Sequence, residues 1–272
     1  GRLMELVDKL SNRQYIDGEW VESSNKNTRD IINPYNQETI FTVAEGTKED
    51  VERAILAARR SFEDGEWSLE TSEVRGKKVR AVADKIKENR EELAKLETLD
   101  TGKTLEESYA DMDDIHNVFM YFAGLADKDG GEIINSPIPN AESKVVKEPV
   151  GVVTQITPWN YPLLQASWKI APALATGCSL VMKPSEITPL TTIRVFELME
   201  EVGFPKGTIN LVLGAGSEVG DVMSGHEEVD LVSFTGGIET GKHIMKQAAN
   251  HVTDVALELG GKNPNIIFDD AD

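Results

Sequence analysis

A cation and a carboxylate stand three positions apart in Lys183-Pro184-Ser185-Glu186, directly after the apolar run 179–182. At the end of a strand, a cation that donates and a carboxylate that accepts can bind the two neighbouring hydroxyls of a ribose. The carboxylate repels a 2′-phosphate, so the pair favours NAD over NADP. A helix start capped by Ser185, with Glu186 favoured by the helix dipole, is the competing interpretation.

Gly214-x-Gly216-x-x-x-Gly220 follows one predicted strand and opens a predicted helix. Backbone amides at a helix N-terminus can face a phosphate. The spacing is one residue longer than that of the usual dinucleotide-binding motif. Phosphate contact and a plain tight turn both remain open from this pattern.

A second glycine-rich segment, 236–242, matches a phosphate-binding P-loop up to its last position. The Ser or Thr that would hold magnesium is replaced by His243, and Glu239 adds negative charge where nucleotide phosphates would lie. A P-loop nucleotide hydrolase therefore stays as an alternative function with two features against it.

Glu258 ends an otherwise apolar predicted strand, where we expect it to be buried and so suited to act as a general base. The single cysteine, Cys178, begins a predicted buried strand, where a thiol is usually an inert small hydrophobe. One cysteine cannot form an intramolecular disulfide, and this fits a reducing, cytoplasmic location.

Alternating apolar strands and amphipathic helices from residue 151 onward must position these residues. We predict strands at 151–156, 179–182, 209–212, 230–234 and 255–259, and helices at 163–175, 191–202, 219–224 and 240–249. This order predicts an α/β fold, a Rossmann-like open parallel sheet with helices on both faces. In such sheets ligands bind at the carboxyl ends of the strands, where all the loops described above lie.

The first half of the chain reads as a hairpin over 14–22 and three helices. The first helix starts with a capping-box pattern at 47–50, the second carries the apolar stripe from Val79 to Leu93, and the third carries one from Met112 to Phe122. We therefore predict three parts. They are the N-terminal hairpin and helices of the NAD-binding domain (1–128), a β excursion that is either an oligomerisation arm or a surface hairpin (129–150), and the Rossmann-like core (151–272).

The net charge excludes two classes of binding partner. The 272 residues hold 28 Lys and Arg against 47 Asp and Glu, a formal net charge of −19. Such a chain lacks the basic footprint that nucleic acids or anionic membrane surfaces require. It also has no apolar run near 18 residues. We therefore expect a small-molecule substrate, with no nucleic acid and no membrane as partner.

Five motifs, at 157–162, 168–174, 183–186, 234–237 and 257–262, together resemble the NAD(P)-dependent aldehyde dehydrogenase superfamily, and within it the bacterial betaine aldehyde dehydrogenases. The resemblance runs from the hairpin to the last residue. It implies oxidation of an aldehyde to a carboxylic acid by a cysteine thiolate, with hydride transfer to NAD. It assigns Asn160 to the oxyanion, Glu258 to the base and Lys169 to a proton relay.

The resemblance also implies binding residues. A structural potassium ion would lie near Ile32, Asp100 and Val252, and NAD would be preferred to NADP. The NAD cleft would be formed by Thr157, Pro158, Trp159, Lys183, Pro184, Ser185, Glu186, Gly216, Phe234, Thr235, Gly236, Gly237 and Gly260.

Tyr161 and Trp168 indicate the substrate. Seven residues apart at the start of a predicted helix, they can bind a trimethylammonium group by cation–π attraction, and ordinary core packing is the competing interpretation. The resemblance then implies a small cationic aldehyde, betaine aldehyde oxidised to glycine betaine, and a homo-oligomeric enzyme.

The family's nucleophilic cysteine lies downstream of the Glu258 motif, and the chain reaches only Asp272. We therefore expect this chain alone to bind NAD without the nucleophile or the catalytic domain. A non-catalytic dinucleotide-binding module is the second alternative.

Overall fold

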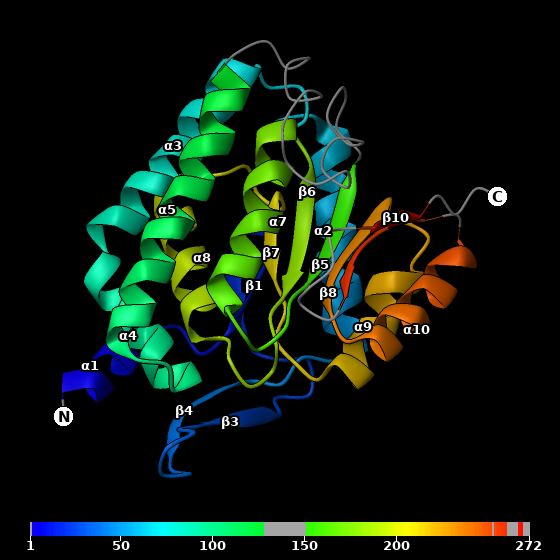
Figure 1. Cartoon of the computed structure of the whole chain (residues 1–272). Helices are drawn as coiled ribbons and strands as arrows, with labels where there is room; N and C mark the ends of the chain where they lie inside the picture. Colours follow the sequence, from blue (N-terminus) through cyan, green and yellow to red (C-terminus); the bar gives the residue numbers. More distant parts are fainter. Residues whose placement is uncertain (1, 128–150, 252, 260–265, 269–272) are drawn as a thin grey trace.

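The computed structural model describes residues 2–127, 151–251, 253–259 and 266–268. An eight-stranded sheet of order β10-β9-β8-β5-β6-β7-β1-β2 lies at its centre (Figure 1). Its strands are β1 (Gln14–Ile16), β2 (Glu19–Val21), β5 (Val152–Ile156), β6 (Ser179–Lys183), β7 (Ile209–Leu211), β8 (Leu231–Gly236), β9 (Asp254–Leu259) and β10 (Ile266–Phe268). The strands β5 to β9 pair in parallel, as predicted, whereas β10 and β1 pair antiparallel at the two sides.

Helices cover both faces of the sheet (Figure 1). One face carries α7 (Pro162–Thr176) and α8 (Leu190–Val202), which are covered in turn by α3 (Ser72–Glu88), α4 (Arg90–Thr101) and α5 (Leu105–Asp127). The other face carries α2 (Lys48–Asp64), α9 (Gly216–Gly225) and α10 (Ile238–Ala249).

The central strand β6 supplies both hydrophobic cores. Leu180 and Met182 belong to the core under α7 and α8, and Val181 belongs to the core under α2 and α9. Successive side chains of a strand point to opposite faces, so a continuous apolar run fits a strand that is buried on both sides.

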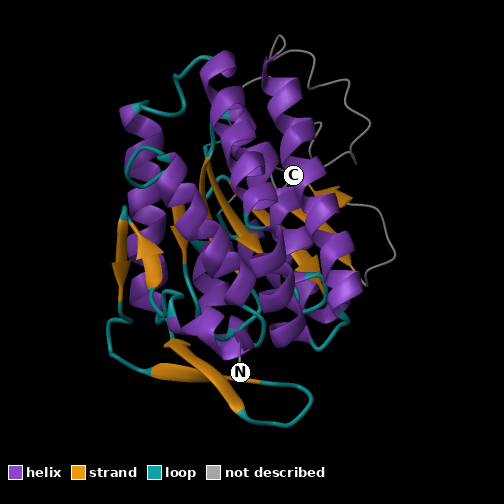
Figure 2. Ribbon diagram, turned by 90° about the vertical axis from the view of Figure 1, so that its left-hand side faces the viewer, coloured by secondary structure: helices purple, strands orange, loops and turns teal. Residues whose placement is uncertain are grey.

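The N-terminal segment adds to the main sheet and forms a small second one. The predicted hairpin is confirmed, and its strand β1 also pairs with β7 through Tyr15 and Leu211, which joins it to the main sheet. The helix α1 (Arg2–Asp8) precedes it. The strands β3 (Thr28–Ile32) and β4 (Thr39–Ala44) form a separate antiparallel pair at the bottom of Figure 2.

The prediction of three helices between the hairpin and residue 128 was wrong, because the second stretch is two helices, α3 and α4. The break falls at Asn89, whose side-chain Nδ2 donates to the carbonyl of Lys85 (2.8 Å) and so closes α3. Ile86 and Leu93 are both fully buried on either side of the break. The apolar stripe thus continues across it, and periodicity gave no sign of the boundary.

The predicted capping box is confirmed. Thr47 Oγ1 accepts from the amide of Asp50, and the Asp50 carboxylate accepts from the amides of Thr47 and Ser24. Two further predictions lie outside the described residues: the β excursion over 129–150 and the glycines after β9. In the described part of the chain, no helix is long and apolar enough to cross a membrane.

Candidate functional site

A cleft of about 750 Å³ opens at the carboxyl ends of β5, β6 and β8. Its size falls within the range of roughly 300–1,000 Å³ that is typical of ligand pockets. It gathers most of the residues predicted to bind the cofactor. These are Thr157, Pro158, Trp159, Lys183, Ser185, Glu186, Gly216, Phe234, Thr235, Gly236 and Gly237. Of the remaining two, Pro184 lies beside the cleft and Gly260 lies outside the described residues.

Two helices begin at this cleft without a side-chain cap. Ala215 and Gly237 are the N-cap residues of α9 and α10, and neither has a polar side chain that could accept from the helix amides. A Cβ on Gly216 or Gly237 would meet no atom within 4 Å. The two N-termini therefore offer amide groups and a favourable dipole to an anion that approaches the backbone closely.

The β3–β4 segment fixes the position of the α9 N-terminus. Glu45 accepts a hydrogen bond from the backbone nitrogen of Ala215 (3.0 Å) and pairs with Arg29. The amide of Gly46 also donates to the carbonyl of Leu213 (2.5 Å). Sequence reasoning missed both residues, because Glu45 accepts from Ala215, which lies 170 residues further along the chain, and Arg29 acts through Glu45.

Lys183 lies almost fully buried at the end of β6. Its Nζ donates to the carbonyls of Pro184 (3.0 Å) and Gly214 (3.1 Å) and lies 3.9 Å from Glu186 Oε2. Burial lowers the pKa of Lys183, and the charges of Glu186 and Glu45 oppose that shift. An ammonium group has three donors, so Lys183 keeps one for a ligand beside the partly exposed Glu186 carboxylate.

The helix-cap interpretation of Ser185 was wrong. The helix that follows, α8, begins at Leu190 with Pro189 as its N-cap. Ser185 instead lines the cleft, and its backbone carbonyl accepts from the amide of Thr188 (3.2 Å).

Two buried hydroxyl groups at the cleft lack a hydrogen-bond partner among the described residues. Thr157 Oγ1 and Thr235 Oγ1 make no hydrogen bond to any described residue, although both side chains are nearly inaccessible. Buried polar atoms are normally satisfied by protein, water or ligand. Their place in the lining indicates that the cleft is built to hold a polar group.

The P-loop alternative does not fit the geometry. Such a loop cradles phosphate between its strand and its helix, but here β8 runs to Gly236, and α10 begins at Ile238. Lys242 lies inside the helix, is mostly exposed and pairs with Glu239 (3.7 Å).

His243 and Asp221 join the two helices that flank the cleft. His243 Nε2 lies 2.6 Å from Asp221 Oδ1, which links α10 to α9, and both residues line the cleft. Sequence reasoning considered His243 only as a departure from the P-loop pattern. It did not single out Asp221, because nothing in their spacing pairs two residues on different helices.

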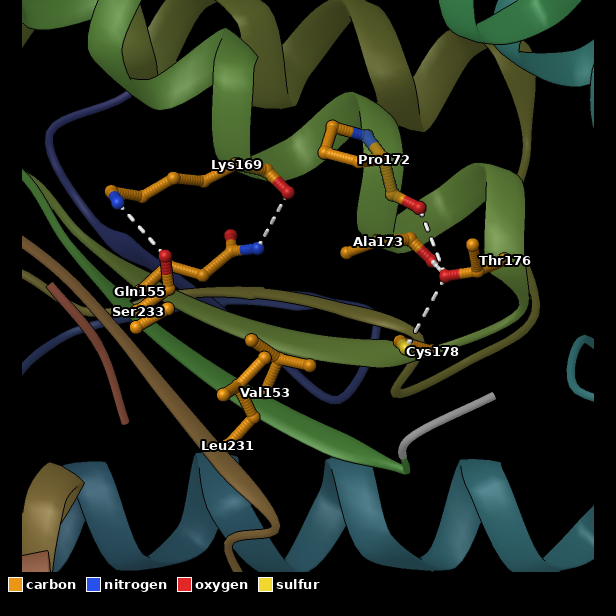
Figure 3. A pocket seen from close by; sticks show the side chains of 10 residues that line it. Val153, Gln155, Lys169, Pro172, Ala173, Thr176, Cys178, Leu231 and Ser233 are labelled. Carbon is orange, nitrogen blue, oxygen red and sulfur yellow. Dashed lines mark hydrogen bonds between the residues drawn. The ribbon is translucent and has the colours of Figure 1, made fainter. Parts of the chain in front are cut away.

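Glu258 lies in the sheet, on β9, and Lys169 lies in helix α7, which covers the sheet. Glu258 is half-buried near the end of β9 and pairs in register with Thr235 of β8. Lys169 projects from α7 toward the sheet, and its Nζ donates to Ser233 Oγ (2.8 Å), as Figure 3 shows. The expected burial of Glu258 is thus only partial, and its proton relay with Lys169 stays a prediction.

Cys178 lines a small cavity between α7 and the sheet, of about 30 Å³ (Figure 3). It is buried, and its Sγ lies 3.5 Å from Thr176 Oγ1. This place in the core agrees with the structural role that the sequence predicted for the thiol.

A second cavity, of about 440 Å³, lies between the α4–α5 link and the loop after β5. Asn160 and Tyr161 line it together with Trp159, which also lines the larger cleft. Trp168 does not line it: its ring packs edge-on against Phe122, with the centroids 6.0 Å apart. The described residues therefore do not bring Tyr161 and Trp168 into one pocket.

The predicted potassium site is only partly described. Asp100 is buried, and its Oδ2 accepts from the amide of Leu190 (2.9 Å), whereas Oδ1 has no partner among the described residues. Burial raises the pKa of Asp100 well above its usual value, which disfavours its charged form. Ile32 is partly exposed on β3, and Val252 lies outside the described residues. Within the described ranges, no three His, Cys, Asp or Glu side chains form a metal cluster.

The aldehyde dehydrogenase family model matches residues 20–272, almost the whole chain. The chain belongs to the aldehyde dehydrogenase family. A betaine aldehyde dehydrogenase of Bacillus subtilis is 66% identical over 263 residues, which cover 97% of this chain and 54% of that protein. Aminoaldehyde dehydrogenase 1 of Pisum sativum, named as peroxisomal, is 47% identical over 271 residues. The match covers 97% of this chain and 54% of that protein.

Among solved structures of the family, betaine aldehyde dehydrogenase of Staphylococcus aureus in complex with NAD+ is 86% identical, with a TM-score of 0.90. The match covers 96% of this chain and 52% of that one. This chain therefore spans about half the length of the relatives that it matches.

Proposed function

We propose that this chain binds NAD in the cleft and serves an NAD-dependent oxidation of an aldehyde to a carboxylic acid. The observation that carries the proposal is the convergence of two uncapped helix N-termini on a cleft that also holds Lys183 and Glu186. The NAD+ complex of the S. aureus relative supports it.

The residues of the cleft fit a dinucleotide. The starts of α9 and α10 supply amides for the diphosphate, and the open space at Gly216 and Gly237 allows it to reach the backbone. The remaining donor of Lys183 and the Glu186 carboxylate bind the two hydroxyls of the adenine ribose. A 2′-phosphate would meet the Glu186 charge, so NAD is preferred to NADP.

The chemistry combines groups of this chain with a cysteine thiolate, the nucleophile that the family resemblance implies. NAD supplies the hydride acceptor. The exposed side-chain amide of Asn160 donates to the oxygen of the aldehyde as negative charge develops there. The Glu258 carboxylate accepts a proton from the water that releases the acid, and Lys169 takes part in moving that proton.

The proposed substrate is a small cationic aldehyde, betaine aldehyde, which is converted to glycine betaine. The names of the B. subtilis and S. aureus relatives support this choice. The exposed ring of Tyr161 in the second cavity supports it independently, because an aromatic face attracts a quaternary ammonium group. We extend the proposal to a cytoplasmic location, from the single cysteine, and to a homo-oligomer, from the family resemblance.

Thermal unfolding with added ligands tests the binding proposal. We expect NAD to raise the Tm of the chain, NADP to raise it less, and magnesium-ATP to leave it unchanged, since ligands that bind only the folded state stabilise it. Stabilisation by magnesium-ATP without stabilisation by NAD would favour the nucleotide hydrolase.

A further inference from the structure

The side chain of Lys103, a cation, lines the second cavity. Lys103 Nζ lies 4.1 Å from the ring centroid of Tyr161 and 2.6 Å from Asp111 Oδ2. Lys103 is largely buried, and so is Asp111. An aromatic face beside a buried carboxylate is the set of contacts that an ammonium ligand requires.

Three elements bring these groups together. Gly102 ends α4 with φ of 81°, a left-handed conformation that glycine adopts readily, and places Lys103 in the short link before α5. Asp111 lies nearly two turns into α5. Tyr161 has φ of 51° and is followed by Pro162 at the first position of α7. The ring thus stands at a backbone conformation that is uncommon outside glycine.

The charges of the cavity decide whether it can bind a cation from solution. Its charged lining residues are Lys103, Asp111 and Glu107. Lys103 neutralises one carboxylate and adds positive charge beside the Tyr161 ring, so it repels a second cation. With Lys103 swung outward on its flexible stem, the same ring and carboxylate become available.

We propose that Lys103 is a specificity-determining residue, an internal occupant of the cation site that the cationic head group of a substrate must displace. The inference rests on the cationic substrate proposed above. Lys103 weakens the binding of ammonium head groups, because it competes with them for the ring of Tyr161 and the carboxylate of Asp111.

Calorimetric titration with tetramethylammonium tests this without any aldehyde or cofactor. We expect Lys103→Met to bind tetramethylammonium at least tenfold more tightly than the original chain. Lys77→Met is the matched control, because Lys77 forms an exposed pair with Glu73 on α3 and its substitution changes the net charge equally. It should bind like the original chain. Adding Asp111→Asn to Lys103→Met should abolish the gain.

Unchanged or weaker binding by a folded Lys103→Met variant would overturn the proposal. If that variant does not fold, NMR of the original chain decides. The ε-methylene signal of Lys103 should be shifted upfield by the Tyr161 ring and should move to its ordinary position as tetramethylammonium saturates. A signal that stays in place at saturation overturns the proposal. Since the probe carries no aldehyde, either result is independent of whether the chain serves aldehyde oxidation.

Discussion

At Glu97, burial is the main cause of a large change in the pKa of a carboxyl group. Its carboxyl group is fully buried in α4, where Oε1 accepts from Thr191 Oγ1 (2.9 Å) and Oε2 has no partner among the described residues. Burial raises its pKa from 4.5 to about 7. The folded chain therefore favours the neutral acid at a pH where the unfolded chain carries the charge.

The contribution of Glu97 to the stability of the chain should consequently fall as pH rises. Between the unfolded pKa of 4.5 and the folded pKa of about 7, its carboxyl group binds more protons in the folded state, so its contribution to the free energy of unfolding decreases through that window. Glu97→Gln keeps an acceptor for Thr191 and removes the titration. We expect its Tm to fall less than that of the original chain between about pH 5 and about pH 8. Parallel Tm profiles would contradict the assignment.

At the scale of elements, the capping box of α2 is a local feature with a measurable contribution. Thr47→Ala removes the acceptor for the Asp50 amide. We expect a loss of about 1 kcal/mol in the free energy of unfolding, measured by urea denaturation. Thr47→Ser keeps the hydroxyl and should lose much less, and equal losses in the two variants would contradict the role of the cap.

Local signals of this kind explain which elements could be predicted from the sequence. The capping box at Thr47 and the apolar run of β6 depend on neighbouring residues, and the structure confirms both. The break at Asn89 was missed because the helices on either side keep the same apolar phase. We predicted a helix from 219, whereas α9 begins at Gly216. The residues before Val219 are Gly216, Ser217 and Glu218, and periodicity cannot detect a turn without an apolar side chain.

The residues of the candidate site also fall into those that the sequence predicted and those that it did not. Lys183, Glu186 and the glycines follow strands directly, so the parallel sheet brings them to one cleft. Glu45 and Lys103 act through partners on other elements, and no sequence spacing shows such pairs. Trp168 was placed in the substrate pocket by helical spacing, but its ring faces Phe122.

At the scale of the whole molecule, the two hydrophobic cores share the central sheet. Leu180 lies in one core and Met223 in the other, both fully buried. We therefore expect one cooperative unfolding transition, because β6 contributes side chains to both cores and cannot unfold from one while it stays packed in the other.

Substitutions in both cores test this. Leu180→Ala and Met223→Ala should each lower the free energy of unfolding by about 2–5 kcal/mol and shift the same transition. Leu56→Ala, on the exposed side of α2, should change it by less than about 0.5 kcal/mol. Two separate transitions by circular dichroism, with only one moved by each variant, would contradict the shared sheet.

The most direct test of the account is calorimetric titration of the chain with NAD, beside two matched variants. Glu186→Gln removes the charge that accepts from the ribose, and Glu73→Gln makes the same change at an exposed position of α3. A hydrogen bond to a charged group contributes roughly 1.5–3 kcal/mol. We predict that the original chain and Glu73→Gln bind NAD equally and that Glu186→Gln binds at least tenfold more weakly. Equal affinity in all three, or no NAD binding by the original chain, would contradict the proposed site.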